Sequence, residues 1–268
     1  MGNFKMLCLD IDGTLLNSQH QITEKTVNII QQVVKEKNLL VILVSARMPK
    51  GIWFLQKELK VRQPIISYNG ALVITNNLEQ LSSLNISISD VKKVYKLAQE
   101  LKLHMSLYKD DNWYVDKMDK WAKEESEITN IKPNILKFDD LISSWKSGAN
   151  KLLCIGTPEK IKVLEEQAKV CSLDKLTIYR SKPTYLEIIP KAASKTTAIK
   201  TLQEKFNIKR EEVIAIGDNY NDIDMLTYAG LGVAMGNSPQ EVKKAANEVT
   251  RSNDNDGVAE AIREYILN

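Results

Sequence analysis

The chain has 268 residues, of which 43% are hydrophobic and 26% are charged, so it can bury a core in one large domain or in two smaller ones. Its 37 basic and 34 acidic residues are well mixed and give a net charge of +3, which excludes the basic stripe of a nucleic-acid-binding protein. No apolar run approaches the roughly 18 residues that cross a membrane, and no secretory signal opens the sequence. We therefore expect a cytoplasmic protein with neither nucleic-acid nor membrane partners.

Four short apolar runs, each followed at once by small or polar residues, predict strands of a parallel sheet. In chain order these runs are residues 6–9, 39–44, 65–68 and 213–216. Helical patterns lie between them, with Thr23 as the cap of one helix and Pro49 in the first turn of the next. Ligands of such sheets bind beyond the carboxyl ends of the strands, where the strand order reverses, so we expect the polar strand endings to converge.

The middle of the chain has a different pattern, with helix signals at residues 89–101 and 157–170 beside strand-like runs. Polar or proline-containing turns at residues 109–112 and 181–183 predict two hairpins. Core-like patterns then return from Ser194 onward. We predict an α/β protein with a Rossmann-like, parallel-sheet core domain formed by residues 1–83 and 187–268, into which an α+β cap domain is inserted at residues 84–186.

Two pairs of carboxylates follow two of the predicted strands. Asp10 and Asp12 are two residues apart at a strand end, so their carboxylates can face the same side, and Gly13 permits the turn that follows. Carboxylates held close together repel each other unless a cation lies between them or one is protonated. Asp218 and Asp222 form the second pair, and oxygen ligands around an open position suit Mg²⁺. An isolated Asp-x-Asp-Gly is equally well explained as a turn, but the two pairs together are more specific.

These segments appear in an order that resembles the haloacid dehalogenase (HAD) superfamily, and within it the Cof-type phosphatases, which carry an α/β cap between the two halves of the core. The matching segments are residues 10–15, residues 45–47, Lys195, and residues 217–222. The resemblance covers essentially the whole chain. It implies a Mg²⁺-dependent phosphatase acting on small phosphorylated metabolites, with sugar phosphates favoured and flavin mononucleotide or pyridoxal phosphate as further candidates.

The resemblance also implies a role for each site residue. Asp10 would be the nucleophile that becomes an aspartyl-phosphate, and Asp12 would be the general acid and then the general base. One Asp10 oxygen, the Asp12 backbone carbonyl and Asp218 would hold Mg²⁺, while Asp222 would orient Lys195 or act through water. The residues expected to bind the phosphate or the substrate are Ile11, Ser45, Ala46, Arg47, Asn69, Lys195 and Asn221.

Lys195 follows Ser194, a candidate helix cap, so its charge would lie where a helix N-terminus already favours anions. Arg47 has two interpretations, a ligand of the substrate or a surface residue. The chain departs from the family pattern twice: the second motif is Ser-Ala-Arg where Thr-Gly-Arg is common, and Thr196 stands where Gly is common. Neither change removes a functional group, although Ala46 restricts the backbone more than Gly would.

Two alternatives stay open. A phosphomutase of similar fold would also form an aspartyl-phosphate but would pass the phosphoryl group to a sugar, and a non-hydrolysing module would bind a phosphorylated metabolite without turnover. His20 and His104 lie outside the motifs, so we expect no histidine catalysis. Trp113 and Tyr114 are candidates for the wall around the leaving group, with a place in a hydrophobic core as the equally open alternative.

Overall fold

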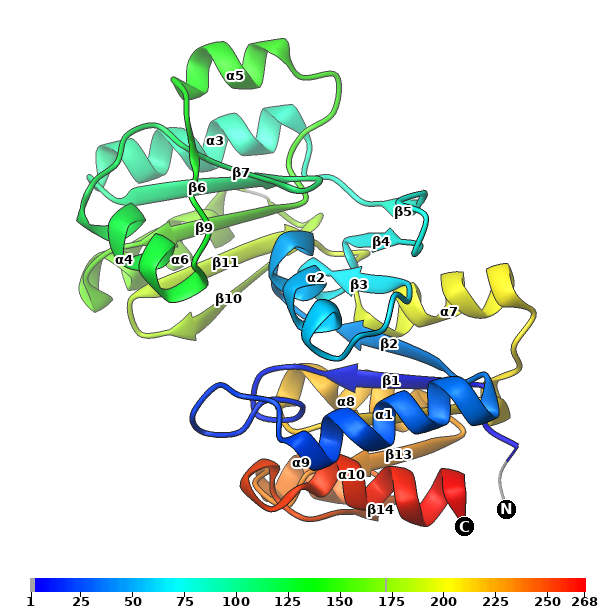
Figure 1. The fold of residues 1–268 in the computed structure, drawn as a ribbon. Coiled ribbons are helices and arrows are strands. Elements are labelled where there is room, and N and C mark those ends of the chain that lie inside the picture. The colour runs from blue at the N-terminus through cyan, green and yellow to red at the C-terminus, as the bar shows by residue number, and fades with distance from the viewer. Residues whose placement is uncertain (1–2, 172) are drawn as a thin grey trace. The chain divides into compact units, whose positions relative to one another are not determined.

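The structure, a computed structural model, describes residues 3–171 and 173–268. The chain forms two compact units (Figure 1). The core unit comprises Met1–Arg47, Ile52–Ser82 and Ser194–Asn268, and the insert unit comprises Met48–Gly51 and Ser83–Ala193. The insert unit extends beyond the predicted boundary at residue 186. The strand at Tyr185–Pro190 crosses this boundary, and it pairs with another strand of the insert unit as far as Pro190.

The core unit contains an eight-stranded sheet in the order β14-β13-β12-β1-β2-β3-β4-β5. The strands are β1 (Met6–Asp10), β2 (Leu40–Val44), β3 (Ile65–Ser67), β4 (Leu72–Ile74), β5 (Gln80–Ser83), β12 (Val213–Gly217), β13 (Leu231–Ala234) and β14 (Glu248–Val249). β1 pairs in parallel with β2 on one side and with β12 on the other. The chain therefore leaves β1 toward β2 and β3 and later returns to its other side, so the strand order reverses at β1.

Helices cover both faces of this sheet (Figure 1). They are α1 (Glu24–Lys37), α2 (Pro49–Glu58), α7 (Lys195–Phe206), α8 (Ile223–Tyr228), α9 (Gln240–Ala245) and α10 (Gly257–Ile262). α7, α8 and α9 pack on alternate residues of β1 and β2, such as Met6 and Ile42, while α1 and α10 contact each other. Thr23 caps α1 by accepting a hydrogen bond from the Thr26 N–H, as the sequence predicts. The predicted α/β class with a mainly parallel core sheet is confirmed.

The insert unit contains a six-stranded sheet in the order β10-β11-β9-β6-β7-β8. Its strands are β6 (His104–Lys109), β7 (Asn112–Val115), β8 (Asn134–Ile135), β9 (Lys151–Ile155), β10 (Leu176–Lys182) and β11 (Tyr185–Pro190). Both predicted hairpins are present, with shorter turns than expected. Asp110 adopts the left-handed conformation, with φ 52°, that a two-residue hairpin turn requires, so Lys109 and Asn112 pair as strand residues.

Among its described residues, four helices complete the insert unit. They are α3 (Ile88–Glu100), α4 (Lys120–Thr129), α5 (Phe138–Ser144) and α6 (Pro158–Val170). α3 and α6 pack on the sheet through a buried apolar cluster that includes Val91, Leu164 and Leu152. His104 is buried, and its two ring nitrogens bond to Asp119, the cap of α4, and to Ser106. His104 therefore links the N-terminus of α4 to strand β6.

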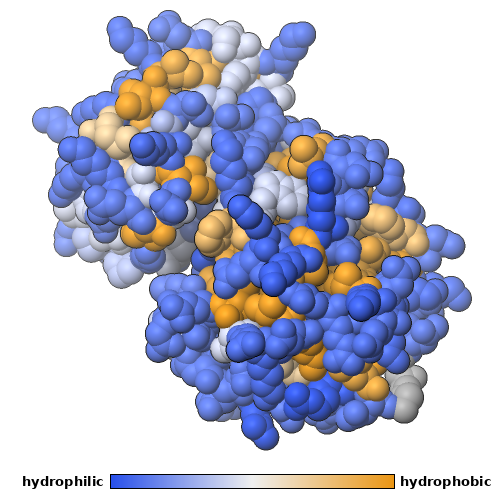
Figure 2. Space-filling view, in the orientation of Figure 1, coloured by the Kyte–Doolittle hydropathy of each residue, from blue (hydrophilic) through white to orange (hydrophobic). Residues whose placement is uncertain are grey.

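The face of the molecule drawn in Figure 2 is mostly hydrophilic, with smaller apolar areas over both units. Scattered apolar groups of this kind are ordinary for folded proteins. Within residues 3–171 and 173–268, no helix has both the length and the hydropathy that a membrane span requires.

Candidate active site

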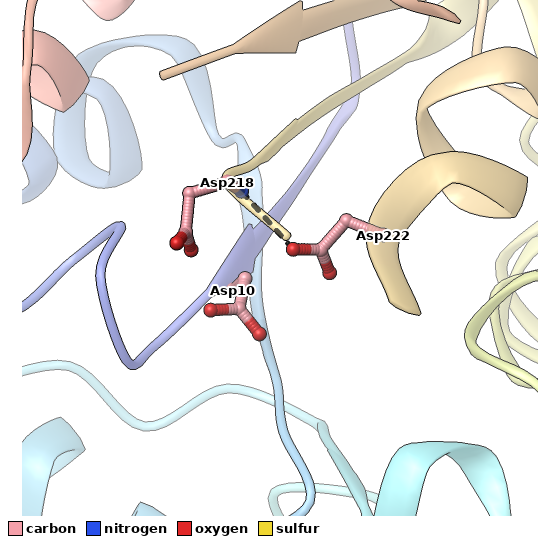
Figure 3. Close-up of side chains that lie close together, drawn as sticks. All are labelled: Asp10, Asp218 and Asp222. Atoms are coloured by element: carbon pink, nitrogen blue, oxygen red, sulfur yellow. Dashed lines mark hydrogen bonds between the residues drawn. The ribbon is translucent and has the colours of Figure 1, made fainter. Parts of the chain in front are cut away.

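The candidate site lies where the strand order of the core sheet reverses. β1 ends in Asp10, and the neighbouring β12 is followed at once by Asp218. A single turn of 3-10 helix, Tyr220–Asp222, then brings Asp222 to the same place. The side chains of Asp10, Asp218 and Asp222 each offer an oxygen within 4.8 Å of the other two, and all three lie around one small space (Figure 3). The expected convergence of strand ends thus occurs here.

Lys195 supplies a fixed positive charge to this cluster. Its Nζ donates hydrogen bonds to Oδ1 of Asp10 and to Oδ1 of Asp222, both at 2.5 Å. Its side chain is only 1% exposed, and it begins α7 directly after the cap residue Ser194. Burial lowers the pKa of Lys195, but the charges of Asp10 and Asp222 outweigh burial and hold this pKa above its ordinary value. Lys195 is therefore a permanent cation in the site.

Asp222 uses both of its oxygens inside the protein. Oδ1 accepts the Lys195 hydrogen bond, and Oδ2 accepts hydrogen bonds from the backbone N–H groups of Asp218 and Asn219, each at 3.0 Å. Gly217 makes this approach sterically feasible, because a Cβ there would lie 2.6 Å from the Cβ of Asp222. Asp222 is fully buried, so its geometry is that of a group that orients Lys195 and the Asp218 backbone.

Two residues that follow β1, Gly13 and Thr14, contact the Asp218 carboxylate. Thr14 Oγ1 donates a hydrogen bond to Asp218 Oδ1 at 2.8 Å. Gly13 has a φ of +87°, and a Cβ at this position would lie 2.4 Å from Asp218 Oδ2. Gly13 therefore serves both the turn and the close approach of a carboxylate. The sequence did not predict these two contacts, although a hydroxyl residue, Thr14, directly follows Asp-x-Asp-Gly.

The cluster carries more negative charge than Lys195 balances. Burial, and then the charge of Asp222, raises the pKa of Asp10 well above its ordinary value, although Lys195 opposes this shift. Burial also raises the pKa of Asp218 to about 6, against the hydrogen bond from Thr14. Carboxylate oxygens with raised pKa values, gathered around one space, are a donor set that fits a hard divalent cation such as Mg²⁺. The residues present thus fit the predicted metal.

Asp12 lies beside this cluster in sequence but has a different partner. Arg47 donates from Nε to Asp12 Oδ2 at 2.9 Å and from Nη2 to Asp12 Oδ1 at 2.6 Å. The Asp12 side chain is 52% exposed. The structure therefore places the Arg47 guanidinium on the predicted acid–base residue.

The remaining predicted residues lie close to Arg47 or at the strand ends. Ser45 is buried, and its Oγ accepts a hydrogen bond from the Arg47 N–H at 3.1 Å, which leaves its hydroxyl hydrogen to donate elsewhere. The Asn69 N–H bonds to the Ser45 carbonyl at 2.9 Å. Ile11 is buried directly after β1, and Asn221 is exposed on the turn that carries Asp222.

Comparisons with known proteins identify the family. The sequence profile of the haloacid dehalogenase-like hydrolases matches residues 7–262. A Haemophilus influenzae protein named "Putative phosphatase" is 36% identical over 97% of this chain and 98% of its own length. The Bacillus subtilis protein YcsE, named a 5-amino-6-(5-phospho-D-ribitylamino)uracil phosphatase, is 29% identical over 99% of this chain and 97% of its own length.

A solved structure supports the same assignment. The crystal structure of TM0651 from Thermotoga maritima superposes with a TM-score of 0.90 and 32% sequence identity, covering 99% of this chain and 98% of that one. The predicted family and the predicted hydrolase class are therefore confirmed. The chain belongs to the haloacid dehalogenase-like hydrolases.

Proposed function

We propose that this protein is a Mg²⁺-dependent phosphatase that hydrolyses phosphate monoesters of small metabolites through an aspartyl-phosphate on Asp10. One observation carries the proposal: Asp10 stands at the end of β1 with one oxygen on the buried Lys195 and two further carboxylates around it. A nucleophilic carboxylate, a fixed cation and oxygen ligands for a metal are the groups that phosphoryl transfer needs in one place.

In the first half-reaction, Oδ2 of Asp10 attacks phosphorus while Lys195 holds Oδ1. The bond from phosphorus to Asp10 forms and the bond to the leaving oxygen breaks. Asp12 gives its proton to that oxygen, so the leaving group departs as an alcohol. Asp12 suits this task because it lies on the exposed side of the turn after β1, where a leaving group has access.

In the second half-reaction, water attacks the aspartyl-phosphate. Asp12, now a carboxylate, accepts the proton of the water, and the bond between phosphorus and Asp10 breaks to give inorganic phosphate. Asp12 thus donates one proton to the leaving group in the first half-reaction and accepts one proton from water in the second. The enzyme returns to its starting state after each turnover.

The phosphoryl oxygens need several donors, since phosphate monoesters are among the slowest substrates to react in water. We assign this task to Lys195, the Ser45 hydroxyl, the backbone N–H groups of Ile11 and Ala46, and Asn221. Mg²⁺, held by Asp10, Asp218 and the Asp12 carbonyl, would offset the repulsion between the nucleophile and the phosphate. In this assignment each donor would bond to a phosphoryl oxygen whose negative charge has to be stabilised in the transition state.

We place the substrate among phosphorylated polyhydroxy compounds, with sugar phosphates first. The relative YcsE is named for a substrate whose phosphate is on a ribityl chain, which is a polyhydroxylated chain of the same chemical class. We assign the insert unit the role of a cap that recognises the part of the substrate beyond the phosphate.

The test is a kinetic screen of the purified protein with Mg²⁺ over phosphorylated metabolites and p-nitrophenyl phosphate, with inorganic phosphate as the readout. Steady release of phosphate is expected, and Asp10→Asn should abolish it because the nucleophile and a metal ligand are lost together. Substantial kcat in the folded Asp10→Asn variant would refute the mechanism. A requirement for a sugar bisphosphate activator would instead indicate a phosphomutase, and the absence of turnover with every ester would indicate a binding module.

A further inference from the structure

Arg47 holds the acid–base residue of the proposed reaction with both arms of its guanidinium. The two hydrogen bonds to Asp12, at 2.9 and 2.6 Å, form the bidentate fork that arginine makes with a carboxylate. Both oxygens of Asp12 are occupied in this way. The fork fixes the position of the carboxylate and also the rotation of its plane, which a lysine ammonium would not do.

The side chains alone do not explain why this pair is well defined. Arg47 is 33% exposed and Asp12 is 52% exposed, and ion pairs on the surface usually contribute little because both side chains are free to move. The backbone of Arg47, however, is held on both sides. Its N–H bonds to Ser45 Oγ at 3.1 Å, and its carbonyl accepts from Ser67 Oγ at 2.5 Å and from the Tyr68 N–H at 3.2 Å.

The turn that holds the Arg47 carbonyl has an unfavourable backbone. Tyr68 and Asn69 are both left-handed, with φ of 52° and 53°, and a bulky residue in this region is a true outlier. Gly70 follows with a φ of +99°, and a Cβ there would lie 2.1 Å from the Ser194 carbonyl oxygen, directly before Lys195. Strain of this kind persists where the surrounding structure requires a particular geometry. Here the strained turn contacts two backbones: the Tyr68 N–H bonds to the Arg47 carbonyl, and Gly70 lies against the Ser194 carbonyl.

We propose that Arg47 is a positioning residue that acts on the reaction through Asp12 and does not bind the phosphoryl group itself. This inference rests on the proposed function, in which Asp12 transfers the protons. The strained turn fixes the Arg47 backbone, and the Arg47 fork orients the Asp12 carboxylate, which is the form that accepts the proton of the water. One arm of the fork has to release its oxygen before Asp12 can carry the proton that goes to the leaving group. Misplacing a catalytic group by about 1 Å can cost on the order of 10²-fold in rate.

The experiment compares Arg47→Met, Arg47→Lys and the control Arg62→Met, whose arginine bonds to the Asn76 carbonyl. The measurements are kcat, KM and the inhibition constant of inorganic phosphate, all with saturating Mg²⁺. Arg47→Met should lower kcat by roughly 10-fold to 10²-fold, within the share that general acid–base catalysis supplies. KM and the inhibition constant of phosphate should stay unchanged. Arg47→Lys should recover little, since it lacks the fork, while added guanidinium ion should restore part of kcat to Arg47→Met.

A double-mutant cycle separates the two roles of Arg47. In the Asp12→Asn background, Arg47→Met should cause no further loss, because the residue through which Arg47 acts is already inactive. A weaker inhibition by phosphate in Arg47→Met, or losses that multiply in the double variant, would show that Arg47 binds the phosphoryl group and would overturn the proposal. An unaffected Arg47→Met variant of an active enzyme would also overturn it. Absence of hydrolysis by the unaltered protein would instead refute the proposed function.

Discussion

Replacing Lys195 with methionine tests how far the buried ion network stabilises the core unit. Methionine is similar in length and removes the charge and both hydrogen bonds. Asp222, which is fully buried, would then lose its cation, and Asp10 would lose its 2.5 Å partner as well. The change therefore leaves two buried carboxyl groups without the cation that bonds to both.

The expected loss follows from this geometry. Removing one partner of a buried ion pair destabilises a protein by about 3–5 kcal/mol, because the desolvated partner remains. Domains are stable by roughly 5–15 kcal/mol, so Lys195→Met should still fold but with a substantial part of its stability lost. Asp222→Asn in the same chain should restore part of the loss, since the backbone N–H groups of Asp218 and Asn219 can still bond to the amide oxygen.

The assay must report on the core unit alone. Of the four tryptophans, Trp113, Trp121 and Trp145 lie in the insert unit, so total fluorescence follows mainly that unit. Hydrogen exchange measured by mass spectrometry on peptides from β1 and β12 gives the opening free energy of the core sheet directly. The experiment is run with a chelator, so that metal binding does not contribute to stability.

The matched control is Lys205→Met on the same helix. Lys205 pairs with Glu79 at 3.1 Å, with both side chains exposed, and its loss should change the opening free energy by at most about 1 kcal/mol. If Lys195→Met lost no more than this control, the claim that Lys195 balances buried charge would be wrong. If Lys195→Met lost the expected amount of about 3–5 kcal/mol and Asp222→Asn restored none of it, the destabilisation would come from altered packing and not from unbalanced charge.

Three further predictions concern the metal site, its titration and the insert unit. Gly13→Ala should weaken Mg²⁺ binding, measured by calorimetry, by about 10-fold to 100-fold, because its Cβ would displace Asp218; unchanged affinity would contradict this role of Gly13. In metal-free protein the pKa of Asp218 is raised from 3.8 to about 6, so the folded state binds more protons and stability should fall as pH rises through this interval. The melting temperature of Asp218→Asn, measured as a function of pH, should lack this part of the fall. If the melting temperatures of the two proteins changed with pH in parallel, the raised pKa of Asp218 would be contradicted. His104→Ala should lower the melting temperature through its lost bonds to Asp119 and Ser106 but leave kcat nearly unchanged, and a large fall in kcat would reopen histidine catalysis.

The strands and helices next to the site were predictable because each has a strong local signal. β2 and β12 differ from the predicted runs by a single residue, and α7 begins directly after its predicted cap Ser194. The short strands β14, at one edge of the sheet, and β4, next to the other edge, were not predicted. β14 has two residues, both exposed, and β4 has three, all buried, so neither has enough residues to show a pattern of burial.

The site was predictable as a set of strand ends, but its contacts were not. The sequence shows that Asp10 and Asp218 each follow a buried strand, and parallel pairing then brings them together. It cannot show that Arg47 turns toward Asp12, since this depends on the left-handed backbone of Tyr68, a conformation that local propensity disfavours. The roles of the individual site residues remain predictions for the experiments above.

The discontinuous core sheet has a consequence for the order in which the chain folds. β1 needs β12, whose first residue Val213 pairs with Met6, and Lys195 reaches Asp10 across a separation of 185 residues. During synthesis from the N-terminus, Ser83–Ala193 is complete before Lys195 and β12 emerge, so this part of the insert unit can fold while β1 still lacks its neighbour β12. Asp10, the proposed nucleophile, therefore has neither Lys195 nor the carboxylates of Asp218 and Asp222 beside it until late in folding, and an incompletely folded chain should have no phosphatase activity.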